Sequence, residues 1–457
     1  MKKFSAKRQW AARISFATVF AVSLGAGLTN AQAPNGSTQV TDPGVRGGPA
    51  SAGGMLNNLT SNYQDFFTGA LTRFQEVDSV SGTETNAKGV GLGPRFNLNS
   101  CSGCHAQPAI GGSSPASNPQ IGVANEYGAS NTIPRFIRPD GPVREARFIR
   151  NPDGSPDGGV HDLFVITGRH DAGNCNISQP DFEDALEQNN VIFRIPTPLF
   201  GAGLVEAITD SAIMSNASNR AAASVGISGQ ANRSGNDGTV TRFGWKAQNK
   251  SLLMFAGEAY NVEQGVTNEL FPNERDETPG CLINPLPEDG TNTAVNGGYP
   301  ASDYASDLIN FAMFARLSAP PTPATPTAVT TAGAQIFNQI GCNLCHTPTI
   351  NPGTNSPFTG LANPAVSAFS DLLVHHMGER LADNVSQGLA GGDQFRTAPL
   401  WGVGQRIFFL HDGRTNNLIQ AIEAHQSRGS EANQVINNFK QLSPNQAQAL
   451  IDFLRSL

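Results

Sequence analysis

The sequence predicts a mainly α-helical protein in which two related units are fused in tandem, and three observations support this. The pentapeptide Cys-x-x-Cys-His occurs at 101–105 and again at 342–346. Apolar residues recur at helical spacing before the second copy and near the C-terminus. Between the two copies, residues 318–327 read SAPPTPATPT, a composition typical of a linker with polyproline II character.

Each pentapeptide is an attachment site for a c-type haem. The two thiols add across the vinyl groups of one porphyrin, and the adjacent imidazole then lies beneath the ring as the proximal ligand of the iron. Zinc, which needs about four ligands, is the weaker alternative for two such copies in an exported chain. We therefore predict two covalently attached haem c groups. Their residues are Cys101, Cys104 and His105 in the first copy and Cys342, Cys345 and His346 in the second.

The first 31 residues have the three parts of a signal peptide. Residues 1–13 carry five cations and no acid, 14–28 are apolar or small, and 29–33 (TNAQA) offer cleavage after Ala31 or Ala33. The apolar run is shorter than the ~20 residues that cross a bilayer comfortably, and no later segment is long enough. We expect a periplasmic or secreted protein with no membrane span in its mature form. An uncleaved N-terminal anchor is the alternative.

Charge and cysteine content narrow the function classes. The formal net charge is −7 at pH 7, and loss of the cationic signal segment makes the mature chain more acidic. Such a chain does not suit nucleic acid, whose binding depends on phosphate neutralisation, but it suits a small basic electron-donor protein of the cytochrome or cupredoxin type. Cys175 and Cys281 form an even pair in an oxidising compartment, which predicts a disulfide; two free thiols are the alternative.

The chain is expected to divide into five segments. After the signal peptide, residues 32–54 are rich in Gly, Ser, Pro and Thr and predict a flexible tether. A first haem unit over 55–317, the linker 318–327 and a second haem unit over 328–457 follow.

In the first unit, an amphipathic helix is expected within 55–75. Frequent Gly, Pro, Asn and Asp beyond it predict turns and long ordered loops instead of further helices. A short β piece at 163–166 (LFVI) is expected in a small hairpin. The loop that carries Asp153 and Asp157 predicts Asp-Gly turns, with a calcium site as the alternative.

The second unit is predicted to be helical at both ends. Apolar residues within 330–341 have helical spacing just before the haem cysteines. Ser443 and Pro444 form a helix N-cap and first turn, and an apolar helical face continues to Leu457. Two such helices around a haem pentapeptide resemble the class I cytochrome c fold. The first unit is then a similar domain enlarged by long loops and short β pieces.

An internal echo supports duplication. Residues 193–203 (FRIPTPLFGAG) recur in form as 395–404 (FRTAPLWGVG), each some distance after its haem pentapeptide. Tandem fusion of two cytochrome units accounts for the echo, and convergence on a shared loop chemistry is the alternative.

Several longer motifs resemble the di-haem oxidoreductase family, whose members are described as peroxidases or as "thiol oxidoreductases". That family is related to bacterial di-haem cytochrome c peroxidases, to the di-haem enzyme that matures methylamine dehydrogenase, and to di-haem rubber oxygenases. The resemblance implies that one haem reacts with peroxide or oxygen while the other transfers electrons. The motifs are 91–97 (GLGPRFN), 108–112 (PAIGG), 193–208, 242–248 (RFGWKAQ), 395–404 and 410–414 (LHDGR).

The resemblance also places ligands at the second haem. In relatives, a helix after the His-Asp-Gly turn carries the sixth ligand, and here that helix, 417–425, places His425 at the position. We predict that His346 and His425 both ligate the second iron. A solvent-facing role for His425 is the alternative, and His375, His376 and Met377 are then the next candidates.

At the first haem, His105 is proximal and no distal ligand is evident. Glu206 lies among apolar residues, where burial should raise a carboxyl pKa, so we predict it as the general acid/base; a salt-bridged structural acid is the alternative. Relatives place a tryptophan between the haems, and Trp245 is our choice for that relay, with a plain core role as the alternative. Trp401 is expected to pack on the second porphyrin.

The sequence therefore predicts a periplasmic di-haem oxidoreductase of the peroxidase kind, in which the first haem reacts with hydrogen peroxide and the second transfers electrons. Haem-dependent oxidation or oxygenation of an organic or protein substrate is one alternative. A di-haem electron carrier without turnover is another, which the long first unit argues against. Thiol chemistry finds no support, because no cysteine is left over.

Overall fold

The computed structural model describes residues 39–294, 300–351 and 365–457. The predicted signal peptide and the first residues of the predicted tether lie outside these ranges. In the described part of the chain, no helix is both long and apolar enough to cross a bilayer.

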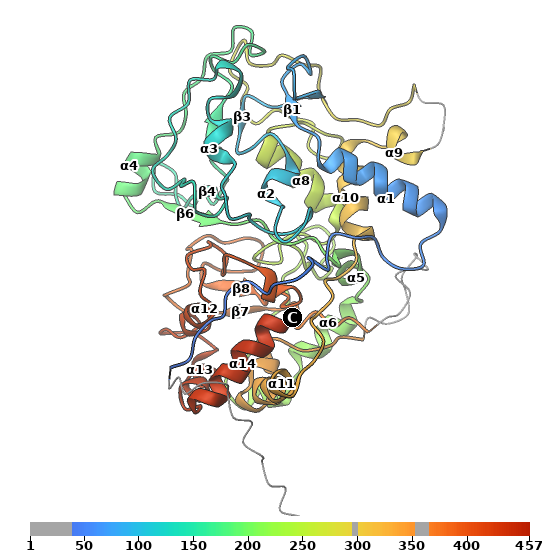
Figure 1. Cartoon of the computed structure of the whole chain (residues 1–457). Coiled ribbons are helices and arrows are strands. Elements are labelled where there is room, and N and C mark those ends of the chain that lie inside the picture. Colours follow the sequence, from blue (N-terminus) through green and yellow to red (C-terminus); the bar gives the residue numbers. More distant parts are fainter. Residues whose placement is uncertain (1–38, 295–299, 352–364) are drawn as a thin grey trace, which may run out of the picture. The chain divides into compact units, whose positions relative to one another are not determined.

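Helices dominate the regular structure, as predicted, and the strands are short (Figure 1). The α-helices are α1 Ser61–Phe74, α2 Cys101–Cys104, α3 Gln120–Val123, α4 Phe182–Glu187, α5 Ala202–Glu206, α6 Asp210–Ala217, α7 Arg220–Ala223, α8 Leu252–Gln264, α9 Ala301–Tyr304, α10 Asp307–Leu317, α11 Ala328–Ile340, α12 Leu418–Ala424, α13 Asn433–Lys440 and α14 Pro444–Ser456. The strands form two-stranded ladders: β1 Asp78–Ser79 with β2 Gly89–Val90 in parallel, and, antiparallel, β3 Arg95–Phe96 with β5 Phe164–Val165, β4 Glu145–Phe148 with β6 Val191–Arg194, and β7 Val374–His376 with β8 Gln394–Arg396.

Two helix pairs frame the haem pentapeptides. In the second unit α11 packs on α14, and in the first unit α1 packs on α10 (Figure 1). The α11–α14 crossing is close because Gly333 has no side chain: a Cβ there would lie 2.0 Å from the Ala449 carbonyl oxygen. Beside it, Phe337 and Phe453 meet edge to face with ring centroids 5.6 Å apart.

The helix signals of the second unit are confirmed. α11 begins after Thr327, whose hydroxyl accepts a hydrogen bond from the Thr330 amide. α14 begins after Ser443, which forms a capping box with Gln446, and Pro444 occupies the first turn.

The first unit holds more helix than the sequence predicted. α8 runs through 13 residues inside the stretch assigned to ordered loops. Its caps are ordinary: the Ser251 hydroxyl accepts from the Met254 amide, and Gly265 ends the helix in the left-handed region at φ 73°. The surrounding glycines masked those signals, so the expectation of loops alone was wrong.

The predicted hairpin at 163–166 was also wrong. The strand exists as β5, but its partner is β3, with Phe96 opposite Phe164 and both rings fully buried. Burial of these two aromatic side chains selects a distant partner over a local turn.

The sequence echo is a structural repeat. A Cβ at Gly203 would lie 2.0 Å from the Arg316 carbonyl oxygen of α10. A Cβ at Gly404 would lie 2.0 Å from the Arg455 carbonyl oxygen of α14. Each echo loop therefore packs on the last helix of its own unit at the same point, which favours tandem duplication over convergence.

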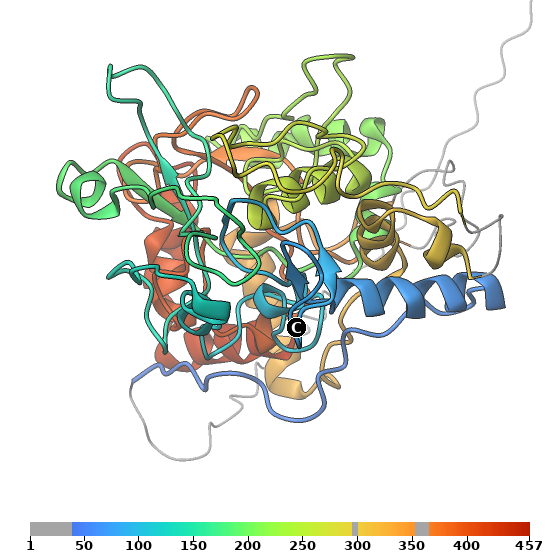
Figure 2. The same ribbon diagram turned by 90° about the horizontal axis from the view of Figure 1, so that it is seen from above.

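The described part of the predicted tether, 39–54, is bound to the second unit, so the expectation of flexibility was wrong there. Asp42 is buried and forms two hydrogen bonds of 2.7 Å with the Arg455 guanidinium of α14. The Arg46 amide donates to the Gly404 carbonyl at 2.8 Å. This segment, dark blue in Figures 1 and 2, runs beside the red C-terminal elements in both views.

The proline-rich stretch 318–327 is extended and runs beside the end of the predicted tether. The Ala319 amide donates to the Gly54 carbonyl and the Thr322 amide to the Ser51 carbonyl, each at 2.9 Å. The two segments thus brace one another, and one apolar cluster draws side chains from both haem units, Leu204 and Val366 among them.

Cys175 and Cys281 form the predicted disulfide, which joins segments 106 residues apart. Both cysteines are buried in the apolar cluster that contains Phe164. In the loop considered for calcium, Asp153 accepts from the Ser155 amide at 2.9 Å and Asp157 pairs with His161 at 2.8 Å, which is the arrangement of ordinary turns.

We predict that Gly404→Ala destabilises the protein. The added methyl group would overlap the Arg455 carbonyl oxygen, and overpacking of this kind costs about 1–3 kcal/mol. Thermal unfolding should show a lower Tm than for the unchanged chain. Gly122→Ala in α3, where a Cβ meets nothing within 4 Å, is the matched control and should not lower Tm.

Candidate haem sites

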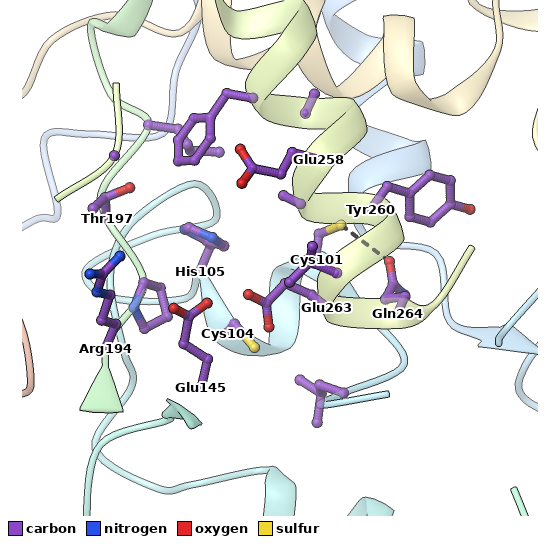
Figure 3. Close-up of a pocket in the computed structure, with 18 of the residues that line it drawn as sticks. Cys101, Cys104, His105, Glu145, Arg194, Thr197, Glu258, Tyr260, Glu263 and Gln264 are labelled. Atoms are coloured by element: carbon purple, nitrogen blue, oxygen red, sulfur yellow. Dashed lines mark hydrogen bonds between the residues drawn. The ribbon is translucent and has the colours of Figure 1, made fainter. Parts of the chain in front are cut away.

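Each haem pentapeptide lines a large cavity. The first cavity contains Cys101, Cys104 and His105 and is walled by α8, by β4 and by the start of the first echo loop (Figure 3). The second contains Cys342, Cys345 and His346 and is walled by α11, α12, α14 and β8. In both, aliphatic and aromatic side chains make up most of the wall.

The proximal-ligand candidates are held alike. His105 donates from Nδ1 to the Gly112 carbonyl at 2.9 Å, and His346 donates from Nδ1 to the Phe369 carbonyl at 3.0 Å. Burial lowers the pKa of both imidazoles to about 4. Each ring is therefore neutral near pH 7 and keeps Nε2 as a lone-pair donor, the state that ligates a metal.

His425 lies in the second cavity with His346. It follows the last residue of α12 and donates from Nδ1 to the Ala421 carbonyl at 2.8 Å. Burial lowers the pKa of His425, and repulsion from a protonated His425 is a further reason for the low pKa of His346. Both imidazoles thus line one cavity and use Nδ1 for a main-chain bond, which makes Nε2 the candidate ligand atom of each.

Two of the three other candidates for the second iron, His375 and His376, are less suited. His375 has both ring nitrogens occupied, Nε2 by Asp371 at 2.9 Å and Nδ1 by Glu431 at 2.8 Å. Burial opposes protonation, but these two carboxylates raise the pKa of His375 well above its usual value. His376 pairs with Asp393 and does not line the cavity, whereas Met377 does line it.

The first cavity is rich in carboxyl groups. Glu145 and Glu263 extend toward one another near His105 (Figure 3) and share a hydrogen bond. Burial and the charge of Glu145 raise the pKa of Glu263 well above its usual value. Burial would also raise the pKa of Glu145, but Arg147, 2.5 Å away, holds it below its usual value. A proton shared by the pair therefore resides on Glu263 in preference to Glu145.

Glu206, predicted as the acid/base, does not line either cavity. Its carboxylate binds the Arg316 guanidinium at 2.6 and 3.1 Å and accepts a hydrogen bond from the Leu252 amide at 2.8 Å. This is the salt-bridged alternative, so we correct the assignment. Glu263 was missed because α8 was not predicted, and Glu145 because its partners lie far away in sequence.

Trp245 lines both cavities, and its Nε1 donates to the Ile195 carbonyl at 2.9 Å. Trp401 lines neither of them, contrary to the expectation that it packs on the second porphyrin. Its ring instead lies against Gly201, where a Cβ would be 2.8 Å from it.

A buried ion cluster next to Trp245 joins the two units. Asp383 lies 2.8 Å from Arg194 and 3.0 Å from the Lys246 ammonium, and all three side chains are at most 4% exposed. Burial lowers the pKa of Lys246 to about 8, although the charge of Asp383 opposes this shift. Lys246 belongs to the RFGWKAQ motif, but nothing in the sequence indicated that Asp383 is its partner.

The donors in both cavities fit haem. Among the described residues, the Nε atoms of Arg144 and Arg194 in the first cavity and of Arg406 in the second are buried without a hydrogen-bond partner. Burial lowers the pKa of Arg406 to about 10, so it stays cationic near pH 7. Buried guanidinium nitrogens without a hydrogen-bond partner suit haem propionates, and the thiols and imidazoles of the pentapeptides line the same cavities.

Comparison with known proteins identifies the family. The family model described as "Di-haem oxidoreductase, putative peroxidase" matches residues 146–457. The chain belongs to this family. The resemblance inferred from the motifs is thereby confirmed, as is a di-haem oxidoreductase assignment at that level.

No curated protein matches the chain. Among solved structures, Kuenenia stuttgartiensis hydrazine synthase pressurized with 20 bar xenon is 18% identical, with a TM-score of 0.22. The match covers 36% of this chain and 60% of that chain, less than two thirds of its length. A likeness at this level carries no information on the fold.

We predict that Asp383→Asn strongly destabilises the protein. It leaves the buried cations Arg194 and Lys246 without their counter-ion, a loss that costs about 3–5 kcal/mol in buried pairs. Chemical unfolding would measure the change. Asp237→Asn removes an exposed partner of Lys250 and serves as the control; equal stability of the two variants would contradict the prediction.

Proposed function

We propose that the protein is a periplasmic di-haem c oxidoreductase that reduces hydrogen peroxide at the first haem and receives electrons through the second. One observation carries the proposal: the two cavities differ in the histidines that line them. The second cavity presents His425 in addition to His346, whereas among the described residues that line the first cavity His105 is the sole histidine, and methionine is absent.

Cofactor attachment follows from the site residues. In the proposal, the thiols of each pentapeptide carry one haem, with His105 and His346 as proximal ligands and His425 as the sixth ligand of the second iron. The two helix pairs, α1 with α10 and α11 with α14, support the interpretation of 55–317 and 328–457 as two cytochrome c-like units.

The structural repeat allows the two cavities to be compared position by position. The Leu252 amide, first in α8, is bound by Glu206, which also binds Arg316 of α10. The Leu418 amide, first in α12, is bound at 2.6 Å by Asp42, which also binds Arg455 of α14. Because α8 and α12 start from matching anchors, each lines its cavity from an equivalent position.

Counting from these two anchors identifies the residue of the first unit that matches His425. His425 lies seven residues after Leu418, and seven residues after Leu252 is Ala259, which lines the first cavity. A methyl group cannot ligate iron, so the sixth position of the first haem is open in this proposal. Glu263 lies four residues beyond Ala259, one helical turn along the same face of α8.

Reduction of hydrogen peroxide consumes two electrons and two protons and yields two water molecules. When bound, a haem iron with an open position supplies the electron chemistry of that reaction. This chain would pass both protons on from solvent: Glu263 would donate each proton to oxygen and would be reprotonated through Glu145, which Arg147 holds ionised.

The position of Trp245 supports an electron path between the cavities. It lines both of them, and its indole is fixed by the hydrogen bond to Ile195. In the proposal, a small electron-donor protein of the cytochrome or cupredoxin type reduces the second haem. An indole between the haems then relays electrons to the first.

We predict that the two haems differ in ligation and that a single substitution changes the ligation of each haem. His425→Ala should convert the low-spin signal of the second haem to high-spin in the EPR spectrum. Ala259→His should convert the first haem from high-spin to low-spin and abolish peroxide consumption. Each variant must retain two covalent haems by mass. Two low-spin haems in the unchanged protein, inert to cyanide and peroxide, would leave only an electron carrier.

We predict that Glu263→Gln slows peroxide consumption by roughly 10²–10⁴-fold, the loss expected when acid–base catalysis is removed. Stopped-flow measurement with a reduced dye as electron donor would give the rate. Glu183→Gln, on an exposed ion pair with Arg135, is the control. A Glu263→Gln protein with unchanged rate and two haems would contradict the role of Glu263.

A further inference from the structure

The N-terminal strap, which we define as residues 39–46, reaches the helix that carries His425. Asp42 divides its carboxylate between two elements: both oxygens bind Arg455 of α14, and Oδ2 also accepts the Leu418 amide of α12 at 2.6 Å. Its side chain is 3% exposed. The strap is further fixed by Thr41, whose amide and carbonyl both bond to the Gln448 side chain of α14.

The first unit needs no such strap. There the equivalent carboxylate is Glu206, which comes from α5 directly after the first echo loop and stays within its own unit. The second echo loop has Ile407 at the matching position, which has no carboxylate to offer. Asp42 supplies that group from a segment more than 370 residues away in the sequence.

α12 depends on such an anchor because it is short. It has seven residues, too few to be stable by itself, so its caps and its packing decide where it lies. At its other end, the His425 ring is tied to α12 through the Ala421 carbonyl. Any shift of α12 therefore moves the imidazole with it.

We propose that Asp42 is a positioning residue for the second haem: the N-terminal strap holds α12 so that His425 stays on the iron. The inference rests on the proposed ligation of that haem by His425. Detachment of the strap releases α12 at its start, frees the sixth position of the second iron for part of the time, and leaves the first haem unaltered.

Two variants of the full-length protein test this through separate atoms. Asp42→Asn removes the charge that binds Arg455 and weakens the bond to Leu418. Leu418→Pro removes the amide hydrogen together with the leucine side chain, and its backbone fits because proline is tolerated at the first position of a helix and Asn417 before it is already extended. Leu418→Ala keeps that amide and is the matched control for the lost side chain, which packs in the apolar cluster with Leu450.

The readout is cyanide binding to the second haem, which requires His425 to leave. We expect Asp42→Asn to bind cyanide about tenfold faster or more than the unchanged protein, and Leu418→Pro to exceed Leu418→Ala by a similar factor. Asp42→Glu should partly restore slow binding. The first haem should bind cyanide at an unchanged rate in all four variants, and each must carry two covalent haems.

The outcomes separate this inference from the proposed function. If His425→Ala changes the spin state of the second haem but neither Asp42→Asn nor Leu418→Pro speeds cyanide binding, the strap has no positioning role. If His425→Ala leaves that spectrum unchanged, the ligand assignment itself fails, and the inference fails with it. Equal acceleration in Leu418→Pro and Leu418→Ala would assign the effect to packing and also overturn it.

Discussion

The arrangement of both cavities depends on one repeated interaction, a carboxylate at most 19% exposed that joins the last helix of a unit to the start of the helix that lines its cavity. Glu206 makes this link through Arg316 and Leu252, and Asp42 makes it through Arg455 and Leu418. An arginine on a buried helix needs an anion, because an unpaired charge is costly away from water. Satisfaction of that charge fixes where α8 and α12 begin, and so which side chains enter each cavity.

Because α8 and α12 have matching anchors, a difference in sequence at one position changes which side chain lines each cavity. With α8 and α12 anchored alike, the residue seven positions on is Ala259 in one unit and His425 in the other. The cavity that Ala259 lines also holds the hydrogen-bonded carboxyl pair Glu145 and Glu263, whereas aliphatic and aromatic side chains make up most of the wall of the cavity that His425 lines. Tandem duplication accounts for two cavities with matching anchors, and these cavities differ at a few positions: one holds a carboxyl pair and the other a second histidine from the anchored helix segment.

The sequence predicted those features whose cause is local. The haem pentapeptides, the capped helices of the second unit and the echo of the two loops each depend on residues within a short window, and so could be recognised. Glu206 was misassigned because its apolar neighbours in sequence suggested burial without a partner, whereas its partner, Arg316, lies 110 residues away. Asp42 was missed for the same reason: a Gly- and Pro-rich composition predicts flexibility, and the ion pair that orders it is with a residue near the other end of the chain.

The cluster around Asp383 shows why the two cavities keep a fixed relation to Trp245. Arg194 and Lys246 precede the linker and Asp383 follows it, so their pairing holds the segments on either side of the indole together. Lys246 also lies 4.0 Å from the centre of the Phe395 ring, a wall residue of the second cavity. The relay proposed for Trp245 would require a fixed separation between the indole and each cavity. A buried ion cluster provides that rigidity better than apolar packing does, because it is satisfied in one geometry only.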